Sequence, residues 1–382
     1  MHFDRNEEQQ LLAESLRRWL AGNYGFEQRR AILGSEAGAS DTAWSTFAEM
    51  GLTALPMPAE AEGFGAGAAD LIDVMEAFGE ALVVEPYLST LVAARLVERA
   101  GSDAQRTELL PRVASGEARM ALAHDEAGQR HGAARIATRA TRGADGYTLE
   151  GTKRVVMHAP LVDHVVVSAR VSGEPGQADG IALFLVAKDA AGVTASPYRS
   201  FDDQPAADLR FSGTPAQPLG DTAERAGAGF AALDEALDYG CALACAEAVG
   251  AIKYANEATL EYIKTRKQFG VPIGSFQVLQ HRAVDMLIEW ELARSMAMLA
   301  CTRIDAAARG TVSADERRRA VSAAKVRISE AARKVSQEAV QLHGGMGLAE
   351  ELKISHTFRR LTALMLAWGD ADHHLARFTG LS

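Results

Sequence analysis

The spacing of the apolar residues changes twice along the chain, and this change most restricts the folds available to it. Up to about residue 120 the apolar residues recur every three or four positions, as Leu12, Leu16 and Trp19 do, which is typical of helices. Between about 121 and 220 short β-rich runs bounded by Gly, Asp and Pro replace that pattern, and long helical patterns then return. We therefore expect a mainly α protein with a small β domain, an α+β fold.

A chain of 382 residues exceeds the usual size of one hydrophobic core, so two or three domains are expected. We predict an N-terminal helical domain at 1–120, a middle β domain at 121–220 and a C-terminal helical bundle at 221–382. Asp4 and Glu7 suit a capping box at the first helix. The predicted strands are 135–141, 147–157, 164–171, 180–187 and 208–211. About four long helices follow 221, with breaks at 270–275, 310–313, 344–347 and 369.

The formal charge of −10 argues against nucleic acid as a partner, since nucleic-acid binders usually carry a basic face. Cys241, Cys245 and Cys301 lie in apolar helical surroundings, with no CxxC pair and no histidine at metal-ligand spacing. We expect buried thiols, a reducing cytoplasm and no metal. The start of the chain has no basic region before an apolar stretch, and no run approaches the ~20 apolar residues of a membrane span, so neither export nor membrane insertion is expected.

Two segments are more specific than the rest. The first runs from Tyr262 to Gly270 and is followed by Phe276-Gln277 and Gln280-His281, and the second is 341–347, which reads Gln-Leu-His-Gly-Gly-Met-Gly. With these segments the sequence resembles the acyl-CoA dehydrogenase family over essentially its whole length. The resemblance implies a helical domain, a β domain and a four-helix bundle. It also implies FAD as cofactor, an acyl-CoA substrate, an electron-transfer flavoprotein or similar acceptor, and a homo- or hetero-tetramer.

The resemblance assigns several residues to FAD. In the family, the arginine of the RxxFG motif and the following FQ glutamine reach the adenosine-diphosphate half of FAD across a subunit interface, which implies these roles for Arg266 and Gln277. The cofactor-binding set also includes Phe269, Gln341, Gly344 and Gly345. These residue types suit the task, because a guanidinium is a planar fork for pyrophosphate oxygens and paired glycines let backbone N–H groups approach a phosphate. The alternatives are a solvated arginine at a helix end and a plain helix stop at 344–345.

The β domain departs from the family's flavin motifs. Most members carry Thr-Glu-Pro followed by Gly-Ser, and later Trp-Ile-Thr, around the isoalloxazine ring. The corresponding stretches here are 124–129, His-Asp-Glu-Ala-Gly-Gln, and 155–158, Val-Val-Met-His. The resemblance therefore places His124 and Met157 at the flavin, with side-chain contacts that differ from the family's and with backbone amides still able to bind.

The larger departure concerns the catalytic base. Dehydrogenation of an acyl thioester needs a carboxylate to remove the α-proton as the β-hydrogen leaves as hydride. The family's Glu-Gly-Thr turn reads Trp368-Gly369-Asp370 here, so tryptophan occupies the usual base position. A second position, used by some members on an earlier helix within Leu-Asp-x-Glu-Arg, holds Gly240.

Two other carboxylates are candidates for the base. Glu247 lies seven residues after Gly240, on nearly the same helix face and among apolar neighbours, where burial is expected to raise the pKa of a carboxylate. Its alternative role is a structural ion pair with a basic residue on a neighbouring helix. Asp370 lies two residues beyond the vacant position, and contact with the cofactor there is as reasonable as catalysis.

The ending 369–375 and the stretch 264–277 resemble the small subunits of pimeloyl-CoA-type dehydrogenases, which are thought to work beside a larger homologous subunit. Three functions follow as hypotheses. The first is an FAD-dependent acyl-CoA dehydrogenase acting on a medium-length or dicarboxylyl thioester. The second is a catalytically silent subunit that completes the FAD site of a homologous partner. The third is a flavin monooxygenase or oxidase on the same fold.

Overall fold

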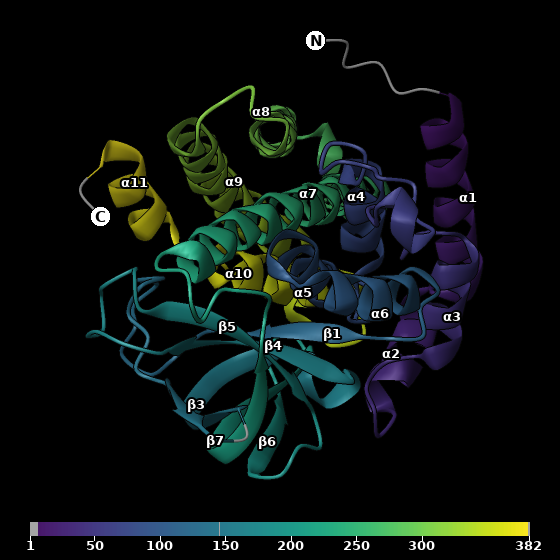
Figure 1. The fold of residues 1–382 in the computed structure, drawn as a ribbon. Coiled ribbons are helices and arrows are strands. Elements are labelled where there is room, and N and C mark those ends of the chain that lie inside the picture. The colour runs from purple at the N-terminus through teal and green to yellow at the C-terminus, as the bar shows by residue number, and fades with distance from the viewer. Residues whose placement is uncertain (1–6, 145, 381–382) are drawn as a thin grey trace. The chain divides into compact units, whose positions relative to one another are not determined.

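Helices make up nearly all of the regular structure before residue 120. The computed structural model describes residues 7–144 and 146–380, so Asp4 of the predicted capping box lies outside the described residues. Ser40 caps the third helix, and Ser102 and Gln105 form a full capping box on the sixth. The elements (Figure 1) are α1 (Glu7–Asn23), α2 (Phe26–Gly34), α3 (Asp41–Glu49), η1 (Ala59–Ala61), α4 (Ile72–Ala81), α5 (Tyr87–Ala100) and α6 (Asp103–Ala114).

Seven strands follow. Three of them, β3, β4 and β5, begin within one residue of their predicted starts. The strands are β1 (Met120–Ala123), β2 (Arg139–Gly143), β3 (Gly146–Met157), β4 (His164–Arg170), β5 (Ile181–Ala187), β6 (Val193–Arg199) and β7 (Pro205–Pro218), with η2 (Ala159–Leu161) between β3 and β4. The strands β1 and β6 were not predicted, and β7 extends beyond the predicted 208–211. Because β6 is exposed along almost its whole length and contains Pro197, it shows no apolar alternation to detect.

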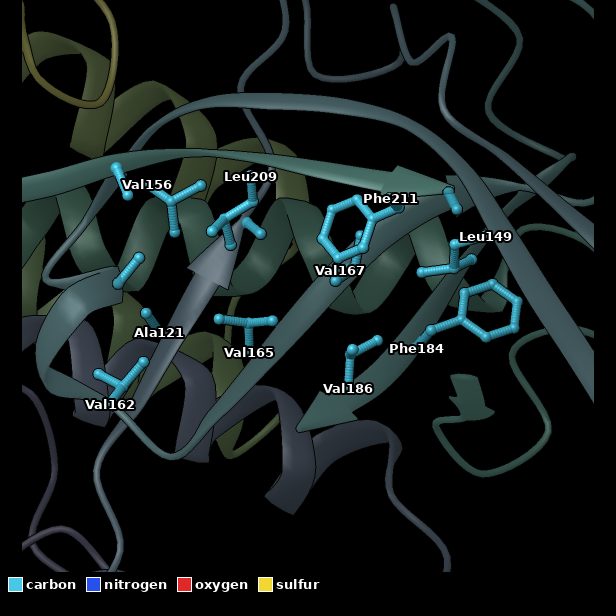
Figure 2. Close-up of a cluster of buried hydrophobic side chains, with 14 of the residues drawn as sticks. Ala121, Leu149, Val156, Val162, Val165, Val167, Phe184, Val186, Leu209 and Phe211 are labelled. Atoms are coloured by element: carbon cyan, nitrogen blue, oxygen red, sulfur yellow. The ribbon is translucent and has the colours of Figure 1, made fainter. Parts of the chain in front are cut away.

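The sheet order is β1-β4-β2-β3-β7-β5, with β6 paired to β7. A further pairing of β5 with β4 returns the order to β4, so five of the strands form a closed ring of pairings. Figure 2 shows the apolar side chains that fill this domain, among them Leu149, Val167, Phe184 and Phe211, each fully buried. The alternation of buried and exposed residues along β3 follows from the opposite directions of successive side chains in a strand.

The C-terminal part is helical. The four predicted breaks separate five helices in the described part of the chain, and the last has nine residues. The elements are α7 (Ala228–Thr265), β8 (Lys267–Gln268), β9 (Val271–Pro272), η3 (Ile273–Ser275), α8 (Gln277–Ala308), α9 (Ala314–His343), η4 (Gly344–Leu348), α10 (Lys353–Leu366) and α11 (Ala371–Thr379). The helix α9 contacts α8, α10 and α11 (Figure 1). None of the described helices is long and apolar enough to cross a membrane.

The observed elements confirm a mainly helical fold with a small β domain. Contacts divide the chain into two compact units. Unit 1 comprises Met1–Arg30, Gly67–Val83 and Cys241–Ser382, and unit 2 comprises Ala31–Ala66 and Val84–Gly240. The N-terminal third is therefore shared between the units, because α1 packs on α4 and α4 contacts α8. The three-domain division at 1–120, 121–220 and 221–382 stays a proposal.

Candidate cofactor and substrate site

The two most specific motifs meet at one end of the helical unit. Tyr262, near the end of α7, stacks on His343, the last residue of α9, with ring centroids 4.3 Å apart. The Tyr262 hydroxyl donates to the His343 carbonyl oxygen at 3.3 Å. Arg266 follows Tyr262 by about one helical turn, and Gly344 follows His343 directly. Residues 81 positions apart in sequence therefore lie side by side.

The predicted cofactor-binding residues of this end are exposed. Among the described residues, none forms a hydrogen bond or ion pair with the Arg266 side chain, and the Phe269 side chain is 91% exposed. Gln277 is the first residue of α8 and Gln341 lies in the last turn of α9, both exposed. This end of the helical unit thus presents the Arg266 guanidinium and the side-chain amides of Gln277 and Gln341 to solvent.

The glycine pair that ends α9 is open. Gly344 has a φ of 63°, and a Cβ atom added at Gly344 or Gly345 would meet no other atom within 4 Å. The end of α9 therefore leaves backbone room for a phosphate, and the arginine supplies the positive charge that a pyrophosphate requires. These residues fit the adenosine-diphosphate half of FAD.

His124 lies inside the β domain. Its Nδ1 is 3.0 Å from the Ser168 hydroxyl, and its Nε2 accepts from the Gln129 amide at 3.0 Å. Burial, with a smaller contribution from the Lys153 charge, lowers the pKa of His124 to about 3. Both ring nitrogens are occupied within the domain, so a cofactor contact at this position falls to the backbone. That contact stays a prediction.

Lys153 and Glu126 form a buried ion pair that holds the same loop. The Lys153 ammonium donates to Glu126 Oε1 at 2.7 Å, to the His124 carbonyl at 3.0 Å and to Ser168 at 3.1 Å. Burial lowers the pKa of Lys153 to about 8, although Glu126 opposes the shift. The Glu126 carboxylate also accepts from two backbone N–H groups of 137–138. The stretch that replaces the family's first flavin motif is thus held in place by buried charges.

The second altered motif contains a strained residue. Val155 has a φ of 50°, which a β-branched residue rarely adopts, and its side chain is 49% exposed. Its N–H donates to the Asp208 carboxylate at 3.0 Å, at a register shift between β3 and β7. Met157 ends β3 two residues later and is half-buried. Whether Met157 contacts the cofactor stays a prediction.

Glu247 is buried and is held by an arginine. The Arg360 Nε donates to Glu247 Oε1 at 2.6 Å and its Nη2 donates to Oε2 at 2.9 Å, which joins α7 to α10. The Glu247 side chain is 6% exposed. Both carboxylate oxygens are therefore engaged, as in the structural ion pair that was the alternative to a catalytic role.

Asp370 caps the last helix. Its Oδ1 accepts from the His373 N–H at 2.8 Å, at the start of α11. The two residues before it, Trp368 and Gly369, have φ values of 62° and 99°. A catalytic or cofactor-binding role for Asp370 stays a prediction beside this capping role.

Sequence reasoning missed several residues that shape the site. Arg360 was anticipated only as some basic residue on a neighbouring helix, since nothing local marks it as the partner of a residue 113 positions away. Lys153 gave a weak signal, because a charged residue at an inward position of the predicted strand 147–157 indicates a buried pair, while its partner Glu126 lies outside the predicted strands. His374 and Lys325, which bond to the backbone around Trp368, gave none.

Comparisons with known proteins agree in all three parts of the chain. The acyl-CoA dehydrogenase N-terminal, middle and C-terminal domain families match residues 6–117, 120–214 and 227–378. An L-prolyl-[peptidyl-carrier protein] dehydrogenase of Pseudomonas fluorescens is 30% identical over 86% of this chain and 87% of its own length.

Two solved structures are also similar. A variant of the Tcur3481–Tcur3483 steroid ACAD has a TM-score of 0.87 and 30% identity, covering 98% of this chain and 97% of that chain. The ChsE4–ChsE5 complex of Mycobacterium tuberculosis has a TM-score of 0.87 and 25% identity, covering 100% and 98%.

Proposed function

Because the chain belongs to the acyl-CoA dehydrogenase family, we propose that it is a subunit of an FAD-dependent acyl-CoA dehydrogenase and completes the FAD site of a homologous partner. The partner supplies the catalytic glutamate. The observation that carries this proposal is a contrast within the chain. Among the described residues, Arg266 makes no side-chain hydrogen bond or ion pair and the glycine pair is exposed, while Glu247 is held by Arg360.

The chemistry explains why the contrast matters. FAD supplies a hydride acceptor for the β-hydrogen of an acyl thioester. A base must take the α-proton, and the indole at position 368 cannot do so. What this chain can do with its own residues is bind the anionic half of the cofactor through Arg266, Gln277 and 341–345.

The assembly we propose is a tetramer of this chain with a homologous subunit. The names of the two similar structures each pair two proteins, Tcur3481 with Tcur3483 and ChsE4 with ChsE5. The resemblance of 264–277 and 369–375 to small subunits of pimeloyl-CoA-type dehydrogenases supports the same arrangement. We further propose an electron-transfer flavoprotein or similar acceptor, and a cytoplasmic location consistent with three free buried cysteines.

The substrate class we propose is an acyl-CoA thioester, with a dicarboxylyl chain such as pimeloyl-CoA as the specific case. The similar proteins carry different substrates in their names, a steroid and a prolyl carrier protein. A panel of pimeloyl-CoA, octanoyl-CoA, a steroid-side-chain acyl-CoA and prolyl carrier protein separates these cases. Faster flavin reduction by either of the last two would contradict the dicarboxylyl assignment.

The test is to purify the chain alone and with a co-expressed homologous subunit, and to measure FAD per chain and anaerobic bleaching of the flavin by acyl-CoA. We expect bleaching only with the partner present. Bleaching by the chain alone would contradict the proposal and would favour a complete enzyme. Oxygen-dependent product formation with added reduced flavin would favour a monooxygenase.

Two substitutions test whether the base belongs to this chain. In the co-expressed assembly, Glu247→Gln and Asp370→Asn are expected to leave the rate of flavin reduction unchanged, because the partner's glutamate takes the proton. Slowing by about two decades or more, with FAD retained, would instead make the altered residue the base. Loss of FAD in Asp370→Asn would place Asp370 at the cofactor. The melting temperature of Glu247→Gln controls for loss of the ion pair with Arg360.

A further inference from the structure

Three polar side chains of unit 2 form a hydrogen-bonded chain. The Ser89 hydroxyl lies 2.7 Å from His158 Nδ1, and His158 Nε2 lies 2.9 Å from the side-chain oxygen of Gln204. Because an amide oxygen only accepts, Nε2 carries the ring proton, and Nδ1 accepts the hydrogen bond of the Ser89 hydroxyl. The imidazole is therefore neutral, and its basic nitrogen faces the hydroxyl.

The backbone fixes His158 and Gln204. His158 directly follows β3 with a φ of 61°, which is unfavourable for a residue with a side chain, and its N–H donates to the Pro205 carbonyl at 2.7 Å. Gln204 directly precedes β7, and its N–H donates to the Ser200 hydroxyl at 3.1 Å. The two residues are 7% and 1% exposed, while Ser89 is only half-buried. The histidine is thus enclosed, and the hydroxyl that it accepts from retains contact with solvent.

Ser89 lies in the first turn of α5, where N–H groups lack partners within the helix. The bond from the Thr90 N–H to the Pro86 carbonyl, at 2.9 Å, begins the helical pattern. No residue that the structure describes accepts from the N–H groups of Leu88 and Ser89. Donors of this kind, at the positive end of a helix, stabilise an oxyanion that develops beside them.

We propose that Ser89, His158 and Gln204 form a second reactive site, at which an acyl thioester is hydrolysed through an acyl group carried by Ser89. Ser89 is the nucleophile, His158 is the base, and Gln204 is a positioning residue that holds the imidazole in one tautomer. A serine or cysteine beside a histidine that a third group orients is the arrangement of acyl-transfer enzymes, and the third group can be a neutral amide. The activity uses no flavin, so it goes beyond the proposed function and does not depend on it.

The reaction has two steps. The Ser89 oxygen attacks the acyl carbonyl carbon and its proton passes to His158 Nδ1, after which the C–S bond breaks and the thiol leaves with that proton. Water then attacks the acyl ester on Ser89 and gives a proton to the same nitrogen. The proton returns to the Ser89 oxygen as the carboxylic acid leaves. Nothing is oxidised or reduced in either step.

The first test is covalent labelling of the full chain with a fluorophosphonate, which reacts with activated serines. We expect one adduct per chain, located by peptide mass spectrometry at Ser89. It should form about 100-fold faster than any adduct at Ser295, a helical serine whose hydroxyl bonds only to the Glu291 carbonyl. Absence of an adduct at Ser89 would overturn the proposal. This measurement uses the wild-type protein, so it does not depend on the folding of a variant.

The second test is hydrolysis of octanoyl-CoA by the full chain without FAD. Ser89→Ala and His158→Asn are expected to lower the rate by about 100-fold or more at an unchanged melting temperature. Asparagine is chosen because it tolerates the left-handed backbone at position 158. Equal rates for wild type and Ser89→Ala would overturn the proposal.

Gln204→Glu tests the positioning role. A carboxylate accepts the same hydrogen bond from His158 Nε2 and also stabilises the imidazolium that forms when Ser89 loses its proton, so labelling should become about tenfold faster. A purely structural Gln204 would give no gain, because the new buried charge would only add a desolvation cost. No gain would exclude Gln204 from the arrangement. Since these assays contain neither FAD nor a partner subunit, their failure would leave the proposed function standing.

Discussion

Arg266 is a charged side chain without a protein partner among the described residues, so its removal should affect ligand binding and not the fold. Arg266→Ala is expected to weaken FAD retention by ~1.5–3 kcal/mol, the scale of one charge-assisted contact. Arg266→Lys keeps the positive charge but loses the planar, paired N–H donors of the guanidinium, so it should recover only part of the affinity for FAD. FAD content after extensive dialysis measures the effect. Full retention by Arg266→Ala would refute the assigned role.

His124 makes the β domain sensitive to acid. Its pKa is about 3 in the folded protein and near 6.5 when exposed, so between these values the unfolded chain binds a proton that the folded chain does not. Stability is therefore complete above pH 6.5 and is lost as the pH falls, by about 2 kcal/mol at pH 5.

The test is chemical denaturation of wild type and His124→Gln at pH 7.5 and pH 5. Wild type should lose about 2 kcal/mol of unfolding free energy on going from pH 7.5 to pH 5 because of His124, and the variant should not show this loss. The stability advantage of wild type over His124→Gln should therefore be about 2 kcal/mol smaller at pH 5 than at pH 7.5. The exposed His281→Gln is the matched control. An equal difference at both pH values would mean that His124 is not the titrating group.

At the scale of elements, α4 and α7 touch backbone to backbone. A Cβ atom at Gly250 would lie 1.9 Å from the Glu76 carbonyl oxygen, and one at Gly79 would lie 1.9 Å from the Glu247 carbonyl oxygen. We expect Gly250→Ala to destabilise by about 2 kcal/mol or more, because backbone on both sides cannot yield. Gly22→Ala in α1, with nothing within 4 Å, should instead be neutral or stabilise by ~0.5–1 kcal/mol. Thermal unfolding of the pair measures both, and equal melting temperatures would show that the helices can separate.

At the scale of the whole molecule, the proposed shared site has a countable consequence. If this chain completes the partner's FAD site and lacks its own base, the assembly should hold about two FAD per four chains. Native mass spectrometry of the co-expressed pair gives the count directly. A homotetramer of this chain with four FAD and acyl-CoA turnover would exclude the shared site.

Most of the fold followed from local pattern. The β-rich apolar runs within 164–187 located β4 and β5, and the glycine-bearing breaks separated α7 to α11. The short β1 and the exposed β6 were missed, because four residues without alternation and an edge strand with proline carry no periodic signal. The motifs implied that one end of the helical unit carries Arg266, Gln277 and 341–345. The stacking of Tyr262 on His343 is the contact that joins the two motif segments there.

The sequence by itself determined which groups are present: the motif arginine and glycines, and an indole where a base is expected. Only the tertiary structure decided what those groups do for one another. It paired Glu247 with Arg360, enclosed His124 with Ser168 and Gln129, and tied Trp368 to His374. The physical reason is the sequence distance over which each effect acts. Helical and strand periodicity depends on residues a few positions apart. A buried charge needs a partner because burial removes its hydration, and that partner can come from any part of the chain.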